Sequence, residues 1–595
     1  MAAALSDGDA PRCEQSLTEF SGLACKGMVR TSAIVEESGC VLAIYGHPHW
    51  PKAGGRTAAI QEVGHEILGA FREHGPTSLA DLEGDFALAI LNAVANEALL
   101  AVDRIGVRNL CYQSDPEGII FASTLDALGQ HPRTKRDLDP QAIYDYLYFH
   151  MVPGPRTIFR RQLRVPAGHY AHFRGGQIEV RPYWHMRYAE NNAGTVADYK
   201  HRLMDALSFA TEQCADDVPC GAFLSGGTDS STITGMMTRT SGKPARTYSI
   251  GFDAAGYDEM HFARIAARHF GATHREYYVT PQDVVDSVPM IAKTFDQPFG
   301  NASAVPTFYC ARSAKLDGVE RMLGGDGGDE LYGGNARYAT QMIYALYGKV
   351  PALLRSLAIE PFLFGLPWPE VGVFRKGRNY VRQARLPMPA RYETYNLLDR
   401  LGRERILTPE FLESIDVRHP QALLEETFRG TDAGSLVNQM LAIDLKFTLA
   451  DNDLRKVTRM CEAAGMDVAF PMLDERVVDL SRELPAELKV KGTRLRYFFK
   501  EALRDFLPLE ILSKEKHGFG LPVGIWLSEY PPLSALAREM LGALKERGIV
   551  RPDFIEFILG DALREHPSYY GVMVWVMMML EGWYREHSSN RHAAK

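Results

Sequence analysis

The stretch FLSGGTDSS, residues 223–231, decides the fold of this chain. It overlaps the end of a hydrophobic run, VPCGAFL (218–224), which predicts a buried strand, and it leads into STITGMM (231–237), which predicts the opening of a helix. Gly226 and Gly227 lack a Cβ, so the backbone between strand and helix can turn with its N–H groups converging on one point. The helix adds unpaired N–H groups and the positive end of its dipole. The turn is therefore predicted to bind an anion such as a phosphate.

The polar side chains of this turn refine the prediction. Ser225, Ser230 and Ser231 offer hydroxyl donors, whereas Asp229 would repel phosphate oxygens unless a cation lay between them. We therefore assign Asp229 to Mg²⁺. The sequence does not follow the Walker pattern GxxxxGK[ST]. It resembles the pyrophosphate-binding loop of ATP pyrophosphatases, which cleave ATP between the α and β phosphates. An ordinary Gly/Ser turn that caps a helix is the alternative.

The segments on either side of this loop predict an α/β protein with two domains. Residues 1–187 contain strand-like runs separated by turns: CVLAIYG (40–46), DFALAILN (85–92), ALLAVD (98–103) and GIIFAS (118–123). Residues 195–590 begin with strands that alternate with helices, which is typical of a parallel sheet: GAFL (221–224), RTYSIGF (246–252), the helix EMHFARIAARHFG (259–271) and REYYV (275–279). Residues 335–440 are expected to form helical additions around a substrate pocket.

Composition narrows the classes of function. The 595 residues are 46% hydrophobic and carry a net charge of −8, which gives no support for a nucleic-acid partner. The eight cysteines form no CxxC pair, so neither a zinc site nor a disulfide framework is indicated, and a cytoplasmic location fits. The longest apolar stretch, GVMVWVMMML (571–580), is shorter than the ~20 residues of a membrane span. We expect it to be a buried helix and expect no membrane partner.

A second chemical cluster is LGGDGGDELYGG, residues 323–334. Its glycines permit a tight turn with backbone exposed to a ligand. Asp326, Asp329 and Glu330 concentrate negative charge, which would repel itself without a cation or a cationic substrate. Asp329 is the expected second Mg²⁺ ligand. A calcium-like loop or a plain polar turn is the alternative if this segment is taken alone.

A third cluster is LSKEKHGFGLPVGIWL, residues 512–527. A lysine in a glycine-bounded loop can close over an active site and neutralise charge that develops on an α-phosphate. Lys516 is the candidate and Lys514 the alternate. His517 is expected to be a neighbour rather than a catalyst, and a solvated surface lysine is the ordinary alternative.

These clusters, taken in order, resemble the asparagine synthetase family, which joins a glutaminase-type N-terminal domain to an ATP-pyrophosphatase synthetase domain. The resemblance covers most of the chain from about residue 80. The matching segments are GDFALAILN (84–92), AVDRIGVRNLCY (101–112), YFHMVPGPRTIFR (148–160), VPAGHY (165–170), FLSGGTDSS, YSIGF (248–252), YDE (257–259), GGDGGDELYGG, FPMLDERVVDLS (470–481) and KHGFGLPVGIWL. The fold that this resemblance implies is an N-terminal Ntn-glutaminase-like α+β sandwich followed by a Rossmann-like PP-loop domain with helical additions.

The resemblance also implies the roles of particular residues. ATP would be bound by backbone contacts of Leu224, Ile250 and Gly325 to adenine and ribose and by a pyrophosphate site at Ser225, Gly227, Asp229 and Ser230, with Gly226, Ser231 and Gly324 also in the nucleotide site. Asp229 and Asp329 would hold Mg²⁺, and Lys516, Asp326 and Glu330 would be catalytic. The implied chemistry has two steps: a carboxylate attacks the α-phosphorus of ATP and releases pyrophosphate, and an amine then displaces AMP to form an amide.

The N-terminal segment departs from the family pattern. Family glutaminases begin, after removal of the initiator Met, with a nucleophilic Cys, but Ala2 stands here. Neither Cys13 nor Cys25 is followed by the family's Gly-Ile/Val-x-Gly, and only GHPHWPKAGGR (46–56) lies where glutamine-holding segments are expected. We expect a glutaminase-like domain without glutaminase activity. This departure resembles β-lactam synthetases and lasso-peptide cyclases, which use an amine already present in the substrate; an intramolecular amine reaches effective molarities of about 10⁵ M or more.

A second departure lies in LADNDLRKVTRMCEAAGMDVAFPMLD, residues 449–474. Compared with the family pattern, Thr458 replaces an Asp, Ala469 an Arg and Asp467 a Glu. These changes argue against aspartate as the substrate. In the ring-forming branches the position of Asp326 belongs to the base that deprotonates the amine.

The leading hypothesis is thus an AMP-forming amide ligase that acts on a small-molecule or peptide carboxylate and an amine, with a precursor peptide in the ring-closing case. A homodimer is compatible with the sequence. The alternatives are an asparagine synthetase that uses ammonia or glutamine, an inactive nucleotide-binding scaffold, and a tRNA-modifying PP-loop enzyme, which the acidic balance opposes.

Overall fold

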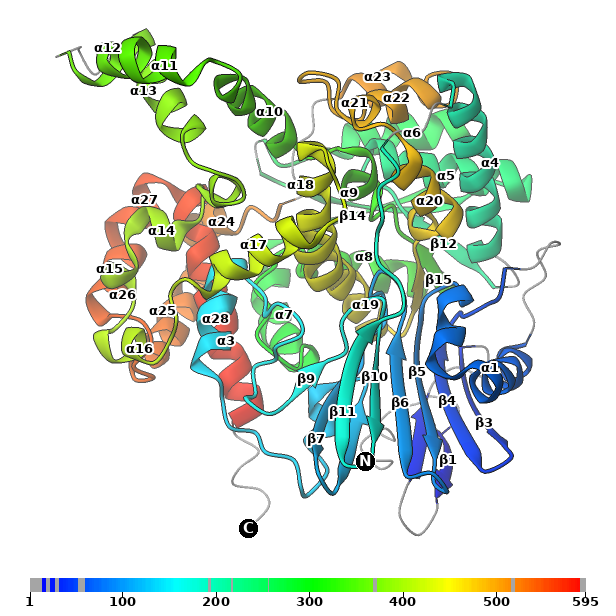
Figure 1. The fold of residues 1–595 in the computed structure, drawn as a ribbon. Coiled ribbons are helices and arrows are strands. Elements are labelled where there is room, and N and C mark those ends of the chain that lie inside the picture. The colour runs from blue at the N-terminus through cyan, green and yellow to red at the C-terminus, as the bar shows by residue number, and fades with distance from the viewer. Residues whose placement is uncertain are drawn as a thin grey trace.

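The computed structural model (Figure 1) describes residues 13–17, 22–26, 31–51, 59–190, 194–215, 218–254, 256–366, 372–514 and 520–588. Antiparallel strands dominate the N-terminal part. They are β1 (Cys13–Leu17), β2 (Gly22–Lys26), β3 (Ser32–Glu37), β4 (Cys40–Gly46), β5 (Phe86–Asn92), β6 (Glu97–Val102), β7 (Cys111–Asp115), β8 (Gly118–Ala122), β9 (Leu163–Arg164), β10 (His169–Arg174) and β11 (Gln177–Pro182). The helices among them are α1 (Ile60–His74), η2 (Gly75–Asp81), α2 (Leu125–Leu128) and α3 (Pro140–Phe149).

The N-terminal strands form layered sheets because their side chains alternate between two cores. The main sheet has the order β11-β10-β6-β5-β4-β3, and a smaller one has the order β8-β7-β9. On β5, Leu88 and Ile90 pack in the core beneath α1. Ala87 and Ala89 point to the opposite core, which also contains Tyr112 of β7. This period of two is what a strand with both faces buried requires.

The second part of the chain is built on a parallel sheet with the order β14-β13-β12-β15-β16. Its strands are β12 (Cys220–Phe223), β13 (Arg246–Phe252), β14 (Thr273–Val279), β15 (Arg321–Leu323) and β16 (Asp467–Ala469). The chain leaves β12 toward β13 and returns on the other side at β15. The strand order therefore switches direction beside β12, and ligands of open α/β sheets bind at such a point.

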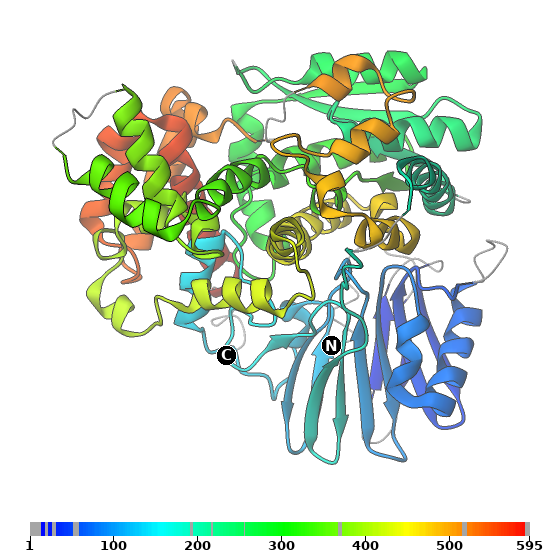
Figure 2. The same cartoon turned by 45° about the horizontal axis from the view of Figure 1, so that its top comes forward.

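Helices cover both faces of this sheet and extend beyond it (Figures 1 and 2). Up to the second chemical cluster they are α4 (Val196–Ala215), α5 (Thr228–Ser241), α6 (Met260–Phe270), α7 (Pro281–Thr294), α8 (Ala304–Leu316) and α9 (Gly328–Tyr332). The following group is α10 (Ala336–Gly348), α11 (Ala352–Leu354), η3 (Arg355–Ile359), α12 (Glu360–Phe364), α13 (Gly372–Ala384), η4 (Ala390–Glu393), α14 (Leu397–Leu401), α15 (Arg403–Ile406), α16 (Pro409–Glu413), α17 (His419–Gly430), α18 (Leu436–Asp444), η5 (Leu445–Asp453) and α19 (Leu454–Ala463). The last group is η6 (Pro471–Leu473), α20 (Glu475–Glu483), α21 (Ala486–Lys489), α22 (Tyr497–Ala502), α23 (Leu509–Ser513), α24 (Val523–Glu529), α25 (Pro531–Lys545), α26 (Pro552–Phe557), η7 (Ile558–Ala562), α27 (Leu563–Glu565) and α28 (Pro567–Ser588).

Most of the predicted elements are confirmed, and one detail is corrected. The strands expected at 40–46 and 246–252 have those bounds, and the apolar stretch 571–580 lies in α28, where Met573 to Leu580 are buried. Helix α5 starts at Thr228 and not at Ser231, because Gly227 provides the extended N-cap. The helical additions expected at residues 335–440 are present, and their role around a substrate pocket stays a prediction.

The structure also bears on membrane contact. Among the described residues no single helix is long and apolar enough to cross a membrane, and one helix pair that meets the criteria together, residues 328–348 and 352–364, is bent by 91°.

Candidate active site

The loop after β12 has the geometry that the sequence predicts for an anion site. Gly226 has φ +67°, and a Cβ there would lie 2.4 Å from the backbone N of Ala263, so only glycine fits. The Ser225 and Ser230 hydroxyls lie 3.0 Å apart, and Ser230 Oγ accepts from the Ser225 N–H at 3.2 Å. No side chain caps the first turn of α5. Its N–H groups and the two hydroxyls therefore face the same place, as an anion site requires.

The loop after β15 packs directly against this turn. A Cβ on Gly325 would lie 2.9 Å from the backbone N of Ser230, and one on Gly328 would lie 2.4 Å from Oδ1 of Asp229. Both glycines are needed because the backbone of this loop approaches the backbone of the first loop at Gly325 and the Asp229 carboxylate at Gly328. Asp229, in the first turn of α5, and Asp329, in the first turn of α9, are thus brought to one site.

Arg496 lies between these two carboxylates. Its guanidinium donates to both oxygens of Asp229 at 2.6 Å and also to Asp329 Oδ1 and Thr228 Oγ1. A Cβ on Gly334 would overlap Asp329 Oδ1, so the absence of a side chain there makes the arrangement possible. Arg496 is buried and has φ +52°. The site therefore already contains one positive charge placed between two carboxylates.

The same donor set fits a divalent cation. Two carboxylates from different loops converge on one point, and carboxylate oxygens are the ligands that Mg²⁺ prefers. The guanidinium occupies the position that a cation bound to both aspartates would occupy. Asp229 and Asp329 are thus the residues that would hold Mg²⁺, and Arg496 would have to move away from at least one of them.

Asp326 and Glu330 belong to an acidic cluster that also contains Asp453. Burial raises the pKa of Asp326 to about 6, although the Lys456 ammonium opposes the change. Burial and the neighbouring Asp453 raise the pKa of Glu330 well above its ordinary range. Lys456 donates to Asp453 at 2.7 Å. A carboxyl group with a pKa near neutral can exchange a proton with a substrate at physiological pH.

The structure describes only part of the third cluster, up to Lys514 and from residue 520 onward. Lys516 and His517 lie outside the described residues, so the role expected for Lys516 stays a prediction. Lys514 donates to the carbonyl oxygen of Gly226 at 3.4 Å, pairs with Glu259 at 3.0 Å and lies over the Phe262 ring. An ammonium group therefore reaches the anion-binding loop from this segment.

The residues expected to contact adenine and ribose lie in or directly after the strands β12, β13 and β15. The Leu224 N–H donates to the Tyr248 carbonyl at 2.9 Å, and the Leu224 carbonyl accepts from Ser249 Oγ. Ile250 lies in β13, and Gly324 donates to the carbonyl of Ala469 at 2.9 Å. Ser231 is buried in α5. The roles of these residues in nucleotide binding remain predictions.

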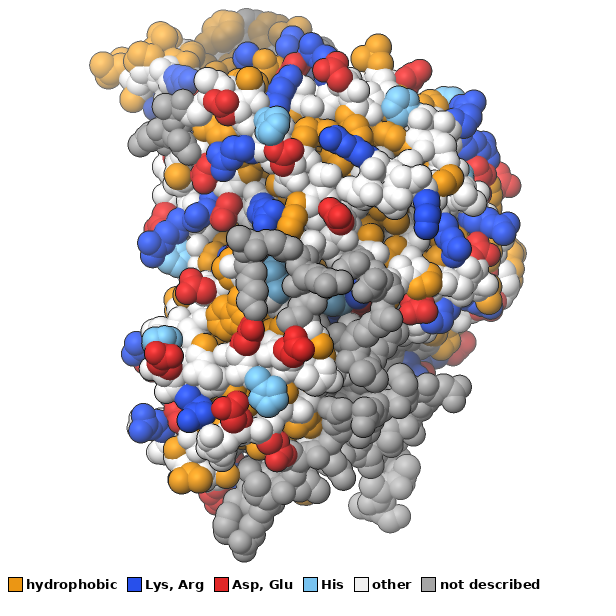
Figure 3. All heavy atoms as spheres, turned by 90° about the vertical axis from the view of Figure 1, so that its right-hand side faces the viewer, with side chains coloured by type: hydrophobic (Ala, Val, Ile, Leu, Met, Phe, Trp, Pro, Cys, Tyr) orange, Lys and Arg blue, Asp and Glu red, His pale blue; other side chains and the backbone are white. Residues whose placement is uncertain are grey.

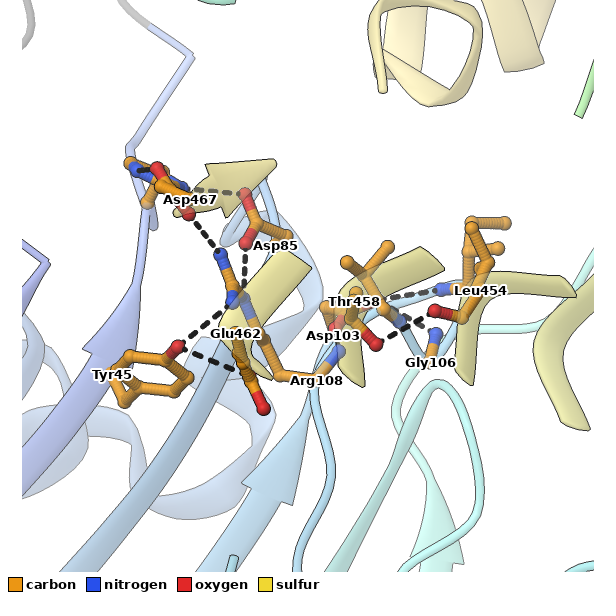
Figure 4. A network of polar contacts seen from close by, with 12 residues as sticks. Tyr45, Asp85, Asp103, Gly106, Arg108, Leu454, Thr458, Glu462 and Asp467 are labelled. Carbon is orange, nitrogen blue, oxygen red and sulfur yellow. Dashed lines mark hydrogen bonds and ion pairs between the residues drawn. The ribbon is translucent and has the colours of Figure 1, made fainter. Parts of the chain in front are cut away.

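Asp467, one of the positions where the family pattern is altered, lies at the contact between the N-terminal part and the parallel sheet (Figure 4). Asp467 pairs with Arg321 at 2.7 Å and with His47 at 3.3 Å, and Arg108 donates to Asp85 at 2.5 Å. The Thr458 hydroxyl donates to the Leu454 carbonyl at 2.7 Å. Asp467 therefore serves the contact between the two parts of the chain, whereas the Thr458 hydroxyl bonds within its own helix, α19.

Stability of this domain contact is predicted to depend on pH through His47. Although burial lowers its pKa, Asp85 at 2.9 Å and Asp467 raise the pKa of His47 to about 9. Because the pKa is raised on folding, the stabilisation is full below pH about 6.5 and is lost as the pH rises through 9. It is at most about 3 kcal/mol.

Urea denaturation at a series of pH values measures this effect. Between pH 6.5 and pH 9, wild type should lose more of its free energy of unfolding than His47→Gln. The surface variant His65→Gln serves as the control and should follow wild type. Equal losses in wild type and His47→Gln would contradict the prediction.

A cavity of about 1520 Å³ lies between the N-terminal sheets and α19. Its lining includes Cys111 and the arginines Arg108, Arg455 and Arg459. Burial raises the pKa of the Cys111 thiol to about 12 and that of the Cys220 thiol to about 11. The pKa values of the other described cysteine thiols are raised as well: Cys40, Cys214, Cys310 and Cys461. These six thiols are therefore not activated as nucleophiles.

Comparisons with known proteins agree with this architecture. A family model described as asparagine synthase matches residues 202–585, and one described as a glutamine amidotransferase domain matches residues 56–184. The chain is 23% identical over 530 residues to glutamine-hydrolyzing asparagine synthetase 1 of Bacillus subtilis (strain 168), covering 88% of this chain and 81% of that protein. It is 28% identical over 286 residues to asparagine synthetase B of Escherichia coli (strain K12), covering 45% of this chain and 46% of that protein.

Among solved structures, the chain resembles a glutamine phosphoribosylpyrophosphate amidotransferase from B. subtilis. The match has 12% identity, covers 41% of this chain and 62% of that one, and has a TM-score of 0.17, too low to support a functional comparison. The two family models match the amidotransferase-like N-terminal part and the helix-rich part that contains both catalytic loops. Because the asparagine synthase model matches well over half of the residues, the chain belongs to the asparagine synthase family.

Proposed function

We propose that this protein is an ATP-dependent, AMP-forming amide ligase that adenylates a substrate carboxylate and passes the acyl group to an amine without hydrolysing glutamine. Membership of the family supports an ATP-dependent amide ligase in general. The observation that carries the finer proposal is the meeting of two aspartates from separate loops, Asp229 and Asp329, beside the buried carboxyl of Asp326.

In the first step the loop after β12 binds the pyrophosphate part of ATP. Backbone N–H groups of α5 and the Ser225 and Ser230 hydroxyls donate to its oxygens, and Lys514 adds positive charge at the loop. The substrate carboxylate attacks the α-phosphorus, and the bond to pyrophosphate breaks. Mg²⁺, when bound to Asp229 and Asp329, would neutralise charge on the departing pyrophosphate.

In the second step an amine attacks the acyl-adenylate and AMP leaves. The attacking amine must lose a proton, and Asp326 is the proposed base because its pKa of about 6 leaves it ionised at neutral pH. The Lys456 ammonium beside it favours the ionised form of Asp326, which is the form that accepts the proton. The products are an amide, AMP and pyrophosphate.

We infer that the amine belongs to the substrate itself, as in the ring-closing branches that the sequence resembles. Burial raises the pKa values of the Cys111 and Cys220 thiols, so neither of these two supplies the reactive thiolate that a glutaminase of this type needs. The substrate would then be a peptide or a small molecule that contains both a carboxylate and an amine.

ATP–pyrophosphate exchange with the purified protein tests the proposal. The panel of carboxylates contains aspartate, N-acyl amino acids and acidic peptides. Exchange with a non-aspartate acid, in the absence of glutamine, is the expected result. Exchange with aspartate alone, followed by asparagine formation, would replace the proposal with asparagine synthesis. The absence of exchange with every acid of the panel would favour a nucleotide-binding scaffold.

A further inference from the structure

The helices α10 to α13 form an arm, residues 336–366 and 372–386, that projects from the body of the molecule (upper left in Figure 1, left in Figure 2). The arm starts directly after the second catalytic loop, where Asn335 caps α10. Its outer segment, residues 352–364, is bent by 91° from the helical stretch before it. The segment therefore lies across the end of the arm and does not continue along it.

The outer segment is apolar but not buried. Its sequence, ALLRSLAIEPFLF, contains leucine, isoleucine and phenylalanine at most positions, yet α11, η3 and α12 bury none of their residues. Leu353 is 74% exposed and Leu357 is 75% exposed. In the part of the chain that the structure describes, 11 of the 19 large hydrophobic side chains that are exposed lie between Ile343 and Tyr395. Exposed apolar side chains gathered in this way mark a binding surface.

The arm is also basic, although the protein is acidic. Residues 336–386 contain eight Lys and Arg side chains and two Asp and Glu side chains, whereas the whole chain carries a net charge of −8. The exposed cations of α13 include Arg375, Lys376 and Arg382, and Val381 is the one residue of that helix that is buried. By contrast, Lys and Arg side chains are mixed with Asp and Glu on the face seen in Figure 3.

We propose that the arm binds the surface of an anionic lipid bilayer, with the side chains of 352–366 among the lipids and the α13 cations at the phosphate head groups. An apolar face beside a row of Lys and Arg is the pattern of elements that lie in a membrane interface. The expectation of no membrane partner rested on the length needed for a span, which an interfacial element does not need.

The charge of the arm decides against a second copy of the chain as its partner. A two-fold pairing places the same surface patch on both subunits. Two basic arms would then face each other, and like charges across an interface weaken association. An anionic bilayer complements both properties of the arm.

Co-sedimentation of the full-length protein with vesicles tests the proposal. One set of vesicles contains equal parts phosphatidylglycerol and phosphatidylcholine, and the other phosphatidylcholine alone. The expected result is that wild type sediments with the anionic vesicles only and is released at high salt. The double variant Leu353→Glu/Leu357→Glu should bind the anionic vesicles at least about tenfold more weakly.

The matched control is Leu316→Glu/Leu509→Glu, because these leucines are 79% and 74% exposed outside the arm. It should bind like wild type, and both double variants should keep pyrophosphate exchange. Binding that survives in Leu353→Glu/Leu357→Glu, or equal binding to neutral vesicles, would overturn the proposal. The proposal is also overturned if wild type binds neither kind of vesicle. In that case, sedimentation velocity would assign the arm to self-association if wild type is a dimer and Leu353→Glu/Leu357→Glu is a monomer.

Discussion

Replacing Asp229 with alanine should lower the rate of ATP–pyrophosphate exchange by about 10²–10³-fold, the loss seen when one electrostatic contact to the reacting group is removed. The carboxylates of Asp229 and Asp329 both pair with the Arg496 guanidinium. In the variant, Asp329 is the one carboxylate of the two that still pairs with Arg496. The site would then lack one of the two ligands for Mg²⁺ next to the phosphates. Initial rates of exchange at saturating substrate measure the effect.

The control for this variant is Asp553→Ala. Asp553 is also paired with an arginine, Arg551 at 3.0 Å, but lies on the surface in α26. It should keep the wild-type rate. A rate for Asp229→Ala close to that of wild type would show that the assignment of Asp229 to Mg²⁺ is wrong.

Replacing Asp326 with asparagine should separate the two half-reactions. Amide formation should fall by about 10²–10⁴-fold, the contribution of a positioned general base. Pyrophosphate exchange should remain, because adenylation does not need this base. In wild type, amide formation should rise with pH through about 6, since burial raises the pKa of Asp326 to that value and only the ionised carboxyl accepts a proton.

Single-turnover measurements with a preformed acyl-adenylate isolate the second step. The rise near pH 6 should be absent in Asp326→Asn. If exchange and amide formation fell by the same factor, Asp326 would act in adenylation or in folding, and the base would have to be sought elsewhere.

The sequence was sufficient to predict both catalytic loops because each consists of neighbouring residues with a clear local signal. SGGTDSS lies between a strand and a helix, and the carboxylates of GGDGGDE lie within one turn. Their meeting follows from the parallel sheet, whose order places β12 beside β15. The structure brings Asp229 and Asp329 together around the Arg496 guanidinium, and the Mg²⁺ ion expected to be shared by the two aspartates stays a prediction.

Arg496 could not be predicted in the same way. It lies 267 positions from Asp229, on a segment with no glycine-rich signal directly around it, and its side chain reaches the site only because α22 begins there. The sequence did single out Asp467, but for a different role from the one that the structure gives it. Its change from the family's Glu was taken as an argument about the substrate, but Asp467 pairs with Arg321 of the neighbouring strand and with His47 across the domain contact. Contacts between distant segments depend on packing, which local patterns do not encode.

The position of Arg496 has a consequence for the order of binding. A guanidinium attached to the backbone beside the site competes with a free metal ion at a high effective concentration. A bare divalent ion, which must displace it without any other new contact, should therefore bind weakly. A metal that arrives already complexed to ATP brings phosphate oxygens that can accept the displaced guanidinium, so the exchange exposes no unpaired charge. The resting enzyme thus carries its own counter-ion and should take up metal and nucleotide as a single ligand.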